Sequence, residues 1–396
     1  MKKTISIILI LSILTFLPIM SHAQIGIKSK AEGLETYSRA NLDLDYDVGG
    51  AYLCEATTGK VLYAKDEFKA ASPASVTKVM TLLLVCEALA ECRINLTDTV
   101  RISANAASMG GSQVFLEEGE RISVEDLIKS TVIASGNDSA VALAELCAGS
   151  ESAFVNMMNL RAAELGLKNT SFENTTGLDD TTVNHYSCAA DIATMSRELI
   201  KHSIILEYSS IWQDTIRNGE FTLTNTNRLI RYYDGCTGLK TGSTDKAGYC
   251  ISATAKRDNM SLIAVVLGAE TRDKRNEIAR ELLDYGFASY AVYRAEEKIV
   301  ENVPVYSAKC ENVALYSSEF SCLVEKTKLS FVETRYSIPE YLAAPVSSGE
   351  VVGGIEYYLD GEQIGRSDLF VKEDIERLSI FDVFLMIISR VVLAKN

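Results

Sequence analysis

The sequence predicts an α+β fold: an antiparallel sheet with a helical insertion, then a small all-β sandwich domain and a terminal amphipathic helix. Two hairpin patterns, at 49–64 and 248–268, enclose a block of helical patterns. After about residue 295, short β-rich runs alternate with Gly, Pro and Asp turns. The last segment, 376–396, is apolar but carries charges. Strands and helices are therefore grouped along the chain, which is typical of α+β proteins.

The N-terminus has the pattern of a secretory signal peptide. Lys2 and Lys3 precede an apolar run, and the small residues Ser21 and Ala23 follow it. We expect cleavage after Ala23, so that 1–23 is the signal peptide and the mature protein is exported. An uncleaved membrane anchor is the alternative, because the apolar run is long for a signal peptide.

The first folded domain is expected at 24–292. Residues 76–90 are apolar almost all round, which predicts a helix buried inside the domain. The turn-rich segment 174–185 predicts an irregular loop. Further helical patterns lie at 123–134, 138–148, 151–165, near 189–202 and at 276–291.

A second domain is expected at 293–375, where Asp360-Gly361 suits the type I′ turn of a hairpin. On a helix, Asp382 and Arg390 of the segment 376–396 share one side, and most apolar residues take the other. These charges and the short length argue against a membrane-spanning helix. The pattern predicts a helix that lies on the membrane surface; packing against the β domain is the alternative.

The composition limits the partners and cofactors. The chain has 39 basic and 53 acidic residues, a net charge of −14, which argues against nucleic acid as a partner. Its nine cysteines are an odd number and include no Cys-x-x-Cys, so we expect mostly small buried side chains and at least one free thiol. With three histidines and no Cys/His cluster at zinc spacing, we expect no metal and no cofactor.

Ser75 and Lys78, at the start of the helix at 76–90, are a candidate nucleophile and base. Residues three apart on a helix lie one turn apart on the same face. Lys78 can accept a proton only if burial or positive neighbours lower its pKa from about 10.4 towards 7. A surface lysine near a helix N-terminus is the alternative. The pattern alone is weak, because Ser243 and Lys246 repeat it in a turn-like segment.

A Ser-His-Asp triad is not supported. Beyond the predicted signal peptide the chain has His185 and His202, neither in a nucleophile-elbow segment, and Gly-x-Ser-x-Gly is absent. A lone histidine has many structural uses, and we interpret both in that way.

Two further polar groups accompany the candidate pair. Ser135-Gly136-Asn137 forms a tight turn between helical patterns, and Ser103-Ala104-Asn105 is a rival for the same motif. Lys240-Thr241-Gly242 occurs once and supplies a cation and a hydroxyl on a strand. Its glycine permits the close approach of a ligand.

The ordered set of these three motifs resembles the penicillin-binding protein and serine β-lactamase superfamily. Segments such as "ASPASVTKVMT", "LGLKNTSFENTTGLDD" and "GLKTGSTDKAGYC" are similar to low-molecular-mass penicillin-binding proteins, the serine-type D-alanyl-D-alanine carboxypeptidases. The resemblance covers roughly residues 35–396, including "VSSGEVVGGIEYYLDGEQIG" in the second domain. It implies a β-lactamase/transpeptidase-like sheet with a helical insertion.

The resemblance also implies an acylation mechanism. Ser75 would attack the carbonyl between the two D-alanines of a peptidoglycan stem peptide, while Lys78 takes its proton. Ser135 and Asn137 would relay a proton to the departing D-alanine and hold the peptide amide. Water would then release the acyl group.

Substrate binding is implied along the Lys-Thr-Gly strand. Lys240 and Thr241, followed by Gly242, would hold the terminal carboxylate. The backbone N–H groups of Ser75 and Ser243 would form the oxyanion hole.

The resemblance places the protein at the outer face of the cytoplasmic membrane or in the cell envelope, with a role in cell-wall synthesis and cell shape. β-Lactam antibiotics would acylate it, and the terminal helix would bind the membrane surface.

Some features depart from this family or leave alternatives open. Gly136 stands where β-lactamases favour aspartate, and Cys188 and Cys236 put the thiol redox state in doubt. A β-lactamase usually needs a Glu-x-x-Leu-Asn segment for deacylation, and the chain has none. A catalytically inactive wall-binding protein is the other alternative, although all the motif residues are present.

Overall fold

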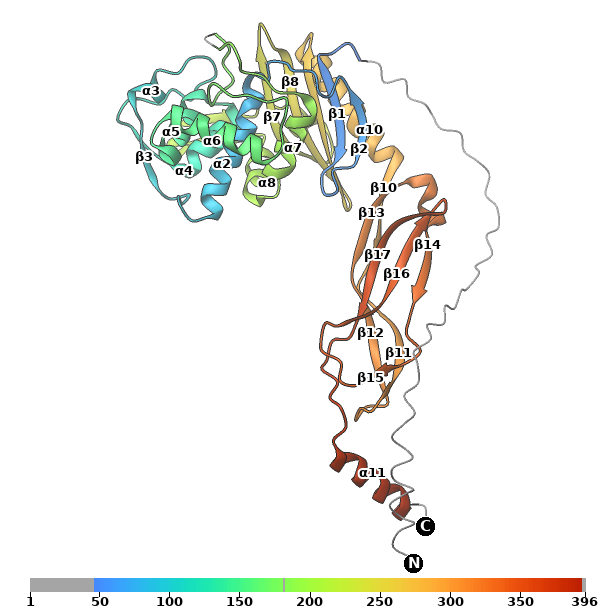
Figure 1. Cartoon of the computed structure of the whole chain (residues 1–396). Helices are drawn as coiled ribbons and strands as arrows, with labels where there is room; N and C mark the ends of the chain where they lie inside the picture. Colours follow the sequence, from blue (N-terminus) through green and yellow to red (C-terminus); the bar gives the residue numbers. More distant parts are fainter. Residues whose placement is uncertain (1–45, 181, 394–396) are drawn as a thin grey trace, which may run out of the picture. The chain divides into compact units, whose positions relative to one another are not determined.

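The structure is a computed structural model that describes residues 46–180 and 182–393, with side chains up to Ile388 (Figure 1). The predicted signal peptide lies outside the described residues. The chain forms two compact units. The large unit comprises the described residues up to Val292 together with Leu323–Thr327, and the small unit comprises Tyr293–Cys322 and the residues from Lys328 onward.

An antiparallel five-stranded sheet forms the framework of the large unit. Its strand order is β2-β1-β9-β8-β7, and both predicted hairpins are confirmed as β1–β2 and β8–β9. Strand β1, from the start of the unit, thus pairs with β9, from its end. The strands are β1 (Gly50–Glu55), β2 (Val61–Lys65), β7 (Cys236–Thr244), β8 (Gly248–Arg257) and β9 (Met260–Ala269).

Both faces of this sheet are buried. Along β9, Leu262, Ala264 and Val266 pack in one cluster with helix α10 (Arg272–Ser289), whereas Ile263 and Val265 pack in the other, with the helical block. Helix α10 and the helical block lie on opposite sides of the sheet (Figure 1). Successive side chains of a strand point to opposite faces, which explains this alternation. A strand buried on both faces is apolar throughout, as the sequence of β9 is.

Helix α2 (Lys78–Ala90) lies inside the helical block, as its apolar sequence predicts, with all its residues buried except three near its C-terminal end. The 3₁₀ turn η1 (Ala74–Thr77) leads into it. Serine or threonine side chains accept a backbone N–H at the start of several helices, which satisfies a free donor there. The other helices are α3 (Ala104–Ala107), α4 (Val124–Lys129), α5 (Asn137–Ala148), α6 (Glu151–Glu164), α7 (Ala189–Leu199), α8 (Ser203–Ser209) and α9 (Leu229–Tyr232).

The continuous helix expected at 123–134 is wrong in its second half. After α4 the chain widens into a π-helical turn, η2 (Ser130–Ala134), and ends at Ser135 with φ 66°. The Ser130 carbonyl accepts from Gly136 N–H, which closes this turn. The turn redirects the chain before α5 begins, and π-turns of this kind occur often at functional sites.

The large unit also contains two short two-stranded sheets. The first pairs β3 (Thr99–Arg101) with β4 (Arg121–Ser123). The second pairs β5 (Gln213–Ile216) with β6 (Phe221–Thr224) and has the short turn η3 (Arg217–Gly219) at its tip.

The small unit is a β structure with a six-stranded sheet in the order β14-β16-β17-β12-β11-β15. Asp360 and Gly361 both have positive φ, at 53° and 85°, which confirms the predicted tight hairpin between β16 and β17. The elements between α10 and α11 along the chain are β10 (Tyr290–Ala295), β11 (Ile299–Tyr306), β12 (Asn312–Ser317), β13 (Phe320–Glu325), η4 (Lys326–Phe331), β14 (Glu333–Ser337), β15 (Leu342–Ala343), β16 (Val351–Leu359) and β17 (Glu362–Phe370).

Helix α11 (Ile380–Leu393) ends the described chain. Ser379 and Asp382 cap it reciprocally: the Asp382 carboxylate accepts from Ser379 N–H, and Ser379 Oγ accepts from Asp382 N–H. The apolar side chains described on this helix are exposed, with Ile380 at 91% and Phe384 at 57%. Of the helices described here, none combines the length and the apolar character needed to cross a membrane.

We predict that Gly177→Ala destabilises the large unit by about 2–4 kcal/mol. Gly177 has φ +81°, and a Cβ there would lie 1.8 Å from the Ala74 carbonyl oxygen. The control is Gly149→Ala, since Gly149 has φ +80° but no atom within 4 Å of its Cβ position. This control should cost only about 1–2 kcal/mol.

Fluorescence of Trp212, the single tryptophan of the chain, follows unfolding of the large unit in urea. Equal losses of unfolding free energy in the two variants would contradict the steric argument.

Candidate active site

Ser75 and Lys78 meet where η1 passes into α2. The Lys78 Nζ lies 2.9 Å from Ser75 Oγ, one helical turn away. Ala74, just before Ser75, has φ +47°, a left-handed conformation that is unfavourable for a residue with a side chain. Strained backbone of this kind persists only where the surroundings enforce it, and it is common at functional sites.

The Lys78 amine is fully buried and has no carboxylate among its hydrogen-bond partners. Besides Ser75 Oγ, it contacts Asn137 Oδ1 at 2.6 Å and the Thr176 carbonyl oxygen at 3.0 Å. Burial is the main cause that lowers the pKa of Lys78 well below its usual value, and the charge of Lys240 lowers it further. Asp138 opposes this shift. The surface-lysine alternative is therefore wrong.

Ser135 and Asn137 lie on the turn between η2 and α5, and both are buried. Lys240 Nζ donates to Ser135 Oγ at 2.8 Å. Asn137 is fixed on two sides: its Nδ2 donates to the Gly110 carbonyl at 2.7 Å, and its backbone N–H donates to the Ser112 carbonyl. The turn thereby connects the Lys78 amine with the Lys240 amine.

Strand β7 supplies Lys240, Thr241, Gly242 and Ser243. Burial, followed by the charge of Arg275, lowers the pKa of Lys240 to about 7. A Cβ on Gly242 would lie 2.7 Å from Ser75 N, so glycine is needed for the strand to approach η1 this closely. Thr241 Oγ1 donates to Thr226 Oγ1 at 2.8 Å.

These residues surround one pocket of about 600 Å³. Its lining brings together Ser75, Ser135 and Thr241 to Ser243, whereas Lys78, Asn137 and Lys240 are buried behind it. Sequence reasoning missed the remainder of the lining, which comprises Ser112, Trp212, Thr224, Asn225, Thr226, Arg228, Tyr232, Arg272 and Arg275.

Arg275 is the clearest of the residues that were missed. It is 3% exposed, donates to Asn276 Oδ1 and faces the Cys250 carbonyl, and burial together with Arg272 lowers its pKa to about 10. The basic run 272–275 marks the start of α10 in the sequence, but nothing there shows that one of its arginines is buried in a pocket.

The rival motifs lie elsewhere. Ser103 caps α3, and Asn105 Nδ2 donates to Glu145, so neither lines the pocket. Lys246 is exposed in the turn after β7, although Ser243 of the same pattern lines the pocket. Within the described part of the chain, no three His, Cys, Asp or Glu side chains are grouped as a metal site.

His185 has a structural position behind the pair. Its Nδ1 accepts from Glu173 N–H, which places the proton on Nε2, and Nε2 donates to Thr77 Oγ1 at 2.8 Å. Burial is the main cause that lowers the pKa of His185 to about 4. The neutral imidazole thus joins the loop at 174–185 to η1.

The two cysteines noted in the sequence are thiols in this structure. Cys188 Sγ accepts from Asp191 N–H at the start of α7, and Cys236 Sγ lies 3.4 Å from the Gly238 carbonyl. Burial is the largest cause that raises the pKa of Cys236 to about 11 and also raises that of Cys188, so both are protonated at neutral pH.

Comparison with known proteins gives a consistent result. The family model "D-alanyl-D-alanine carboxypeptidase" matches residues 37–271, and "Penicillin-binding protein 5, C-terminal domain" matches residues 287–377. The chain is 41% identical to D-alanyl-D-alanine carboxypeptidase DacF of Bacillus subtilis over 95% of both chains. It is 35% identical to DacC of Escherichia coli, over 83% of this chain and 84% of the relative.

Solved structures agree. Penicillin-binding protein 5 of Haemophilus influenzae aligns with a TM-score of 0.69 at 33% identity, over 83% of this chain and 98% of that one. Penicillin-binding protein D2 of Listeria monocytogenes, solved in an ampicillin-bound form, aligns with a TM-score of 0.56 at 31% identity. That alignment covers 61% of this chain and 97% of the other.

We predict that His185 makes the protein acid-sensitive. A histidine whose folded pKa is lowered binds its proton more readily when unfolded, so its contribution to stability falls as pH drops from 6.5 to about 4. The expected loss is about 2–3 kcal/mol over this window.

Urea unfolding at pH 7.5 and 4.5, followed by Trp212 fluorescence, measures this loss. His185→Gln should lower stability at pH 7.5 but show a smaller fall between the two pH values. The same fall in both proteins would refute the role of His185.

Proposed function

The chain belongs to the D-alanyl-D-alanine carboxypeptidase family of penicillin-binding proteins, and from this we propose that Ser75 forms an acyl-enzyme with peptidoglycan stem pentapeptides. As a serine-type carboxypeptidase, the protein is a hydrolase. The observation that carries the proposal is the fully buried Lys78 amine at 2.9 Å from Ser75 Oγ. Hydrolysis removes the terminal D-alanine.

The neutral form of Lys78 fits its surroundings. A neutral amine has two N–H donors and one lone pair. The two hydrogens can be donated to Asn137 Oδ1 and the Thr176 carbonyl, both of which are acceptors. The lone pair then faces Ser75 Oγ and accepts its proton as the oxygen attacks the carbonyl. Asn137 therefore orients the base, in addition to any contact with the peptide.

The oxyanion is assigned to the backbone N–H groups of Ser75 and Ser243. The close packing of Gly242 on Ser75 N brings β7 to this side of the nucleophile. Two preorganised donors would stabilise the tetrahedral intermediate, and one such donor contributes about 3–4 kcal/mol.

The contacts with the leaving group are assigned to Ser135, Lys240 and Thr241. Ser135 Oγ, held by Lys240 Nζ, is the group that passes a proton to the departing amine. Lys240 and Thr241 hold the terminal carboxylate, and we add Arg275 to this clamp because its guanidinium lines the same pocket. Water then hydrolyses the ester on Ser75.

Export and membrane attachment complete the proposal. Cleavage after Ala23 would release the mature chain outside the cytoplasmic membrane, with domains at 24–292 and 293–375. The segment 376–396 would bind the membrane surface. β-Lactams would acylate Ser75, a proposal supported by the ampicillin-bound relative.

We predict that Lys78→Arg strongly lowers the rate of catalysis. An arginine stays protonated and cannot act as a base. Loss of a general base lowers the rate by roughly 10²–10⁴-fold. The assay is D-alanine release from a pentapeptide that ends in D-Ala-D-Ala, together with formation of a labelled-penicillin adduct.

Ser75→Ala is the reference for complete loss in this assay, and Trp212 fluorescence confirms folding of each variant. Release of D-alanine by Ser75→Ala at the wild-type rate would defeat the proposed function. Wild-type activity in Lys78→Arg would defeat the role of Lys78 alone.

We predict that the exposed apolar side chains of α11 attach the protein to lipid. Burying about 25 cal/mol per Å² of apolar surface favours an interfacial helix. Full-length protein should sediment with phosphatidylethanolamine/phosphatidylglycerol vesicles, and Phe384→Ser with Leu385→Ser should lower the bound fraction several-fold.

The matched control for this experiment is Val61→Ser, an exposed apolar residue of the large unit. Equal sedimentation of all three proteins would contradict attachment through α11.

A further inference from the structure

The pocket is strongly cationic on the side away from Ser75. Three arginines, Arg228, Arg272 and Arg275, line it, and none of the described lining residues is acidic. This contrasts with the net charge of −14 for the whole chain. Like charges gathered at one site repel each other, and a bound anion relieves that repulsion. The local charge therefore points to an anionic ligand.

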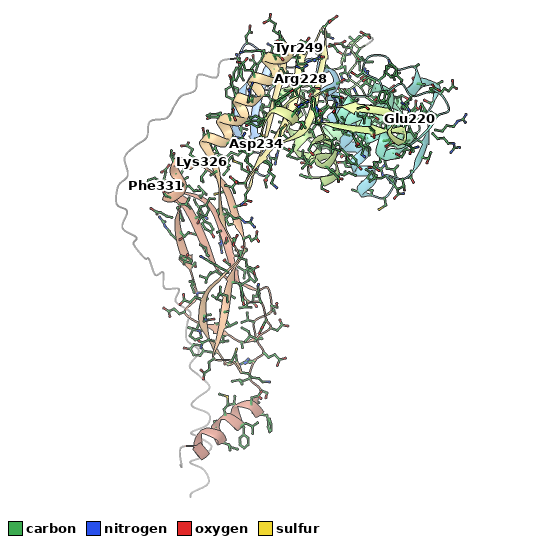
Figure 2. All side chains as sticks on the ribbon, turned by 180° about the vertical axis from the view of Figure 1, so that it is seen from behind. Glu220, Arg228, Asp234, Tyr249, Lys326 and Phe331 are labelled. Atoms are coloured by element: carbon green, nitrogen blue, oxygen red, sulfur yellow. The ribbon has the colours of Figure 1, made fainter. Side chains whose placement is uncertain are left out.

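One carboxylate does not account for all three arginines. In the proposed function, the terminal carboxylate of D-alanine is bound by Lys240, Thr241 and the buried Arg275. Arg228 and Arg272 lie farther out. Arg228 lies on the large unit (Figure 2). Its side chain is 51% exposed, and its contact with Asp273 is long, at 3.9 Å. A long, exposed ion pair is weak and leaves the guanidinium able to bind another anion.

Aromatic side chains accompany the arginines in the lining of the pocket, whose volume is about 600 Å³. Trp212 and Tyr232 form an aromatic wall of the pocket. Arg231 stacks against both rings, with its guanidinium 5.5 Å and 5.7 Å from their centres.

The contacts connect this region to the leaving-group side of the site. Thr241 Oγ1 donates to Thr226, which lies two residues before Arg228. Arg228 in turn contacts Asp273 in the first turn of α10, next to Arg272. A series of contacts thus connects the residues that hold the terminal carboxylate with Arg228 and Arg272.

We propose that Arg228 and Arg272 form a second anion subsite, which takes a leaving group that carries a carboxylate on its side chain. This inference rests on the proposed function and names a substrate class for it: acyl-D-alanyl peptides whose leaving group is an acidic D-amino acid. Such a leaving group is either a free acidic terminal residue or the diaminopimelate of a cross-linked tripeptide, whose second carboxylate is free. The aromatic wall covers the methylene groups between the two carboxylates.

The reaction itself is unchanged. The C–N bond to the leaving amine breaks as the ester to Ser75 Oγ forms, and the serine proton passes through the site to that amine. Water then cleaves the ester and restores Ser75. The outer arginines only select which amine leaves.

The test compares two peptides that differ in one charge, one ending in D-Ala-D-Glu and the other in D-Ala-D-Gln. We expect kcat/KM to favour D-Glu by roughly three- to tenfold, since two exposed charged contacts each contribute modestly. The preference should decline in 0.5 M NaCl, which screens exposed charges. It should disappear in the double variant Arg228→Gln, Arg272→Gln.

The matched control is Arg280→Gln, an exposed arginine of the same helix that does not line the pocket. This variant should keep the preference for D-Glu. Each protein is compared with its own rate on the D-Gln peptide, so a general loss of activity does not affect the ratio.

A peptide dimer in which the leaving amine belongs to the terminal diaminopimelate of a tripeptide distinguishes the two sources. Its cleavage by the wild type, reduced in the double variant, identifies the cross-link as the substrate. A D-Glu preference without dimer cleavage assigns the subsite to free acidic termini.

Equal rates on D-Glu and D-Gln peptides, or a preference that survives the double substitution, would overturn the second subsite. Failure of the proposed function is a separate result, in which D-alanine release does not depend on Ser75.

Discussion

The active site depends on a buried amine, that of Lys78, whose hydrogen-bond partners are all uncharged. Holding a lysine neutral near pH 7 costs on the order of 4 kcal/mol relative to its usual protonated state, so the surrounding fold must supply that free energy. The apolar helix α2 provides the burial, and the second buried amine, Lys240, opposes protonation of Lys78. The same arrangement that destabilises the charged form leaves a lone pair directed at Ser75.

Much of the large unit serves to hold this pair in place. The loop at 174–185 supplies the Thr176 carbonyl and is joined to η1 through His185. On the other side, Gly242 lets β7 reach the backbone of Ser75. Backbone carbonyls and neutral side chains therefore contact the Lys78 amine. A carboxylate in their place would favour the protonated form of Lys78. Asp138, which is also buried nearby, instead accepts the backbone N–H groups of Val114 and Leu116 through Oδ2.

Charge is distributed unevenly over the protein. The chain as a whole is acidic, yet the pocket is lined by arginines and backed by Lys240. A cationic pocket in an acidic surface concentrates the field where a carboxylate binds. The positive groups of the pocket thus favour a peptide with a free C-terminus. After burial, the neighbouring arginines also lower the pKa values of Lys240 and Arg275.

The sequence by itself determined the α+β class, both hairpins of the main sheet, the buried helix and the β hairpin at Asp360-Gly361. These features depend on hydrophobic periodicity and on turn residues, both of which can be recognised from residues close together in the sequence. It also singled out Ser75 and Lys78, but their spacing alone did not distinguish them from Ser243 and Lys246. Burial of one lysine and exposure of the other separated the two pairs, and burial is a property of the packed chain. The π-turn before Ser135, the role of His185 and the arginines of the pocket were decided only by the tertiary structure, because each depends on contacts between segments far apart in the sequence.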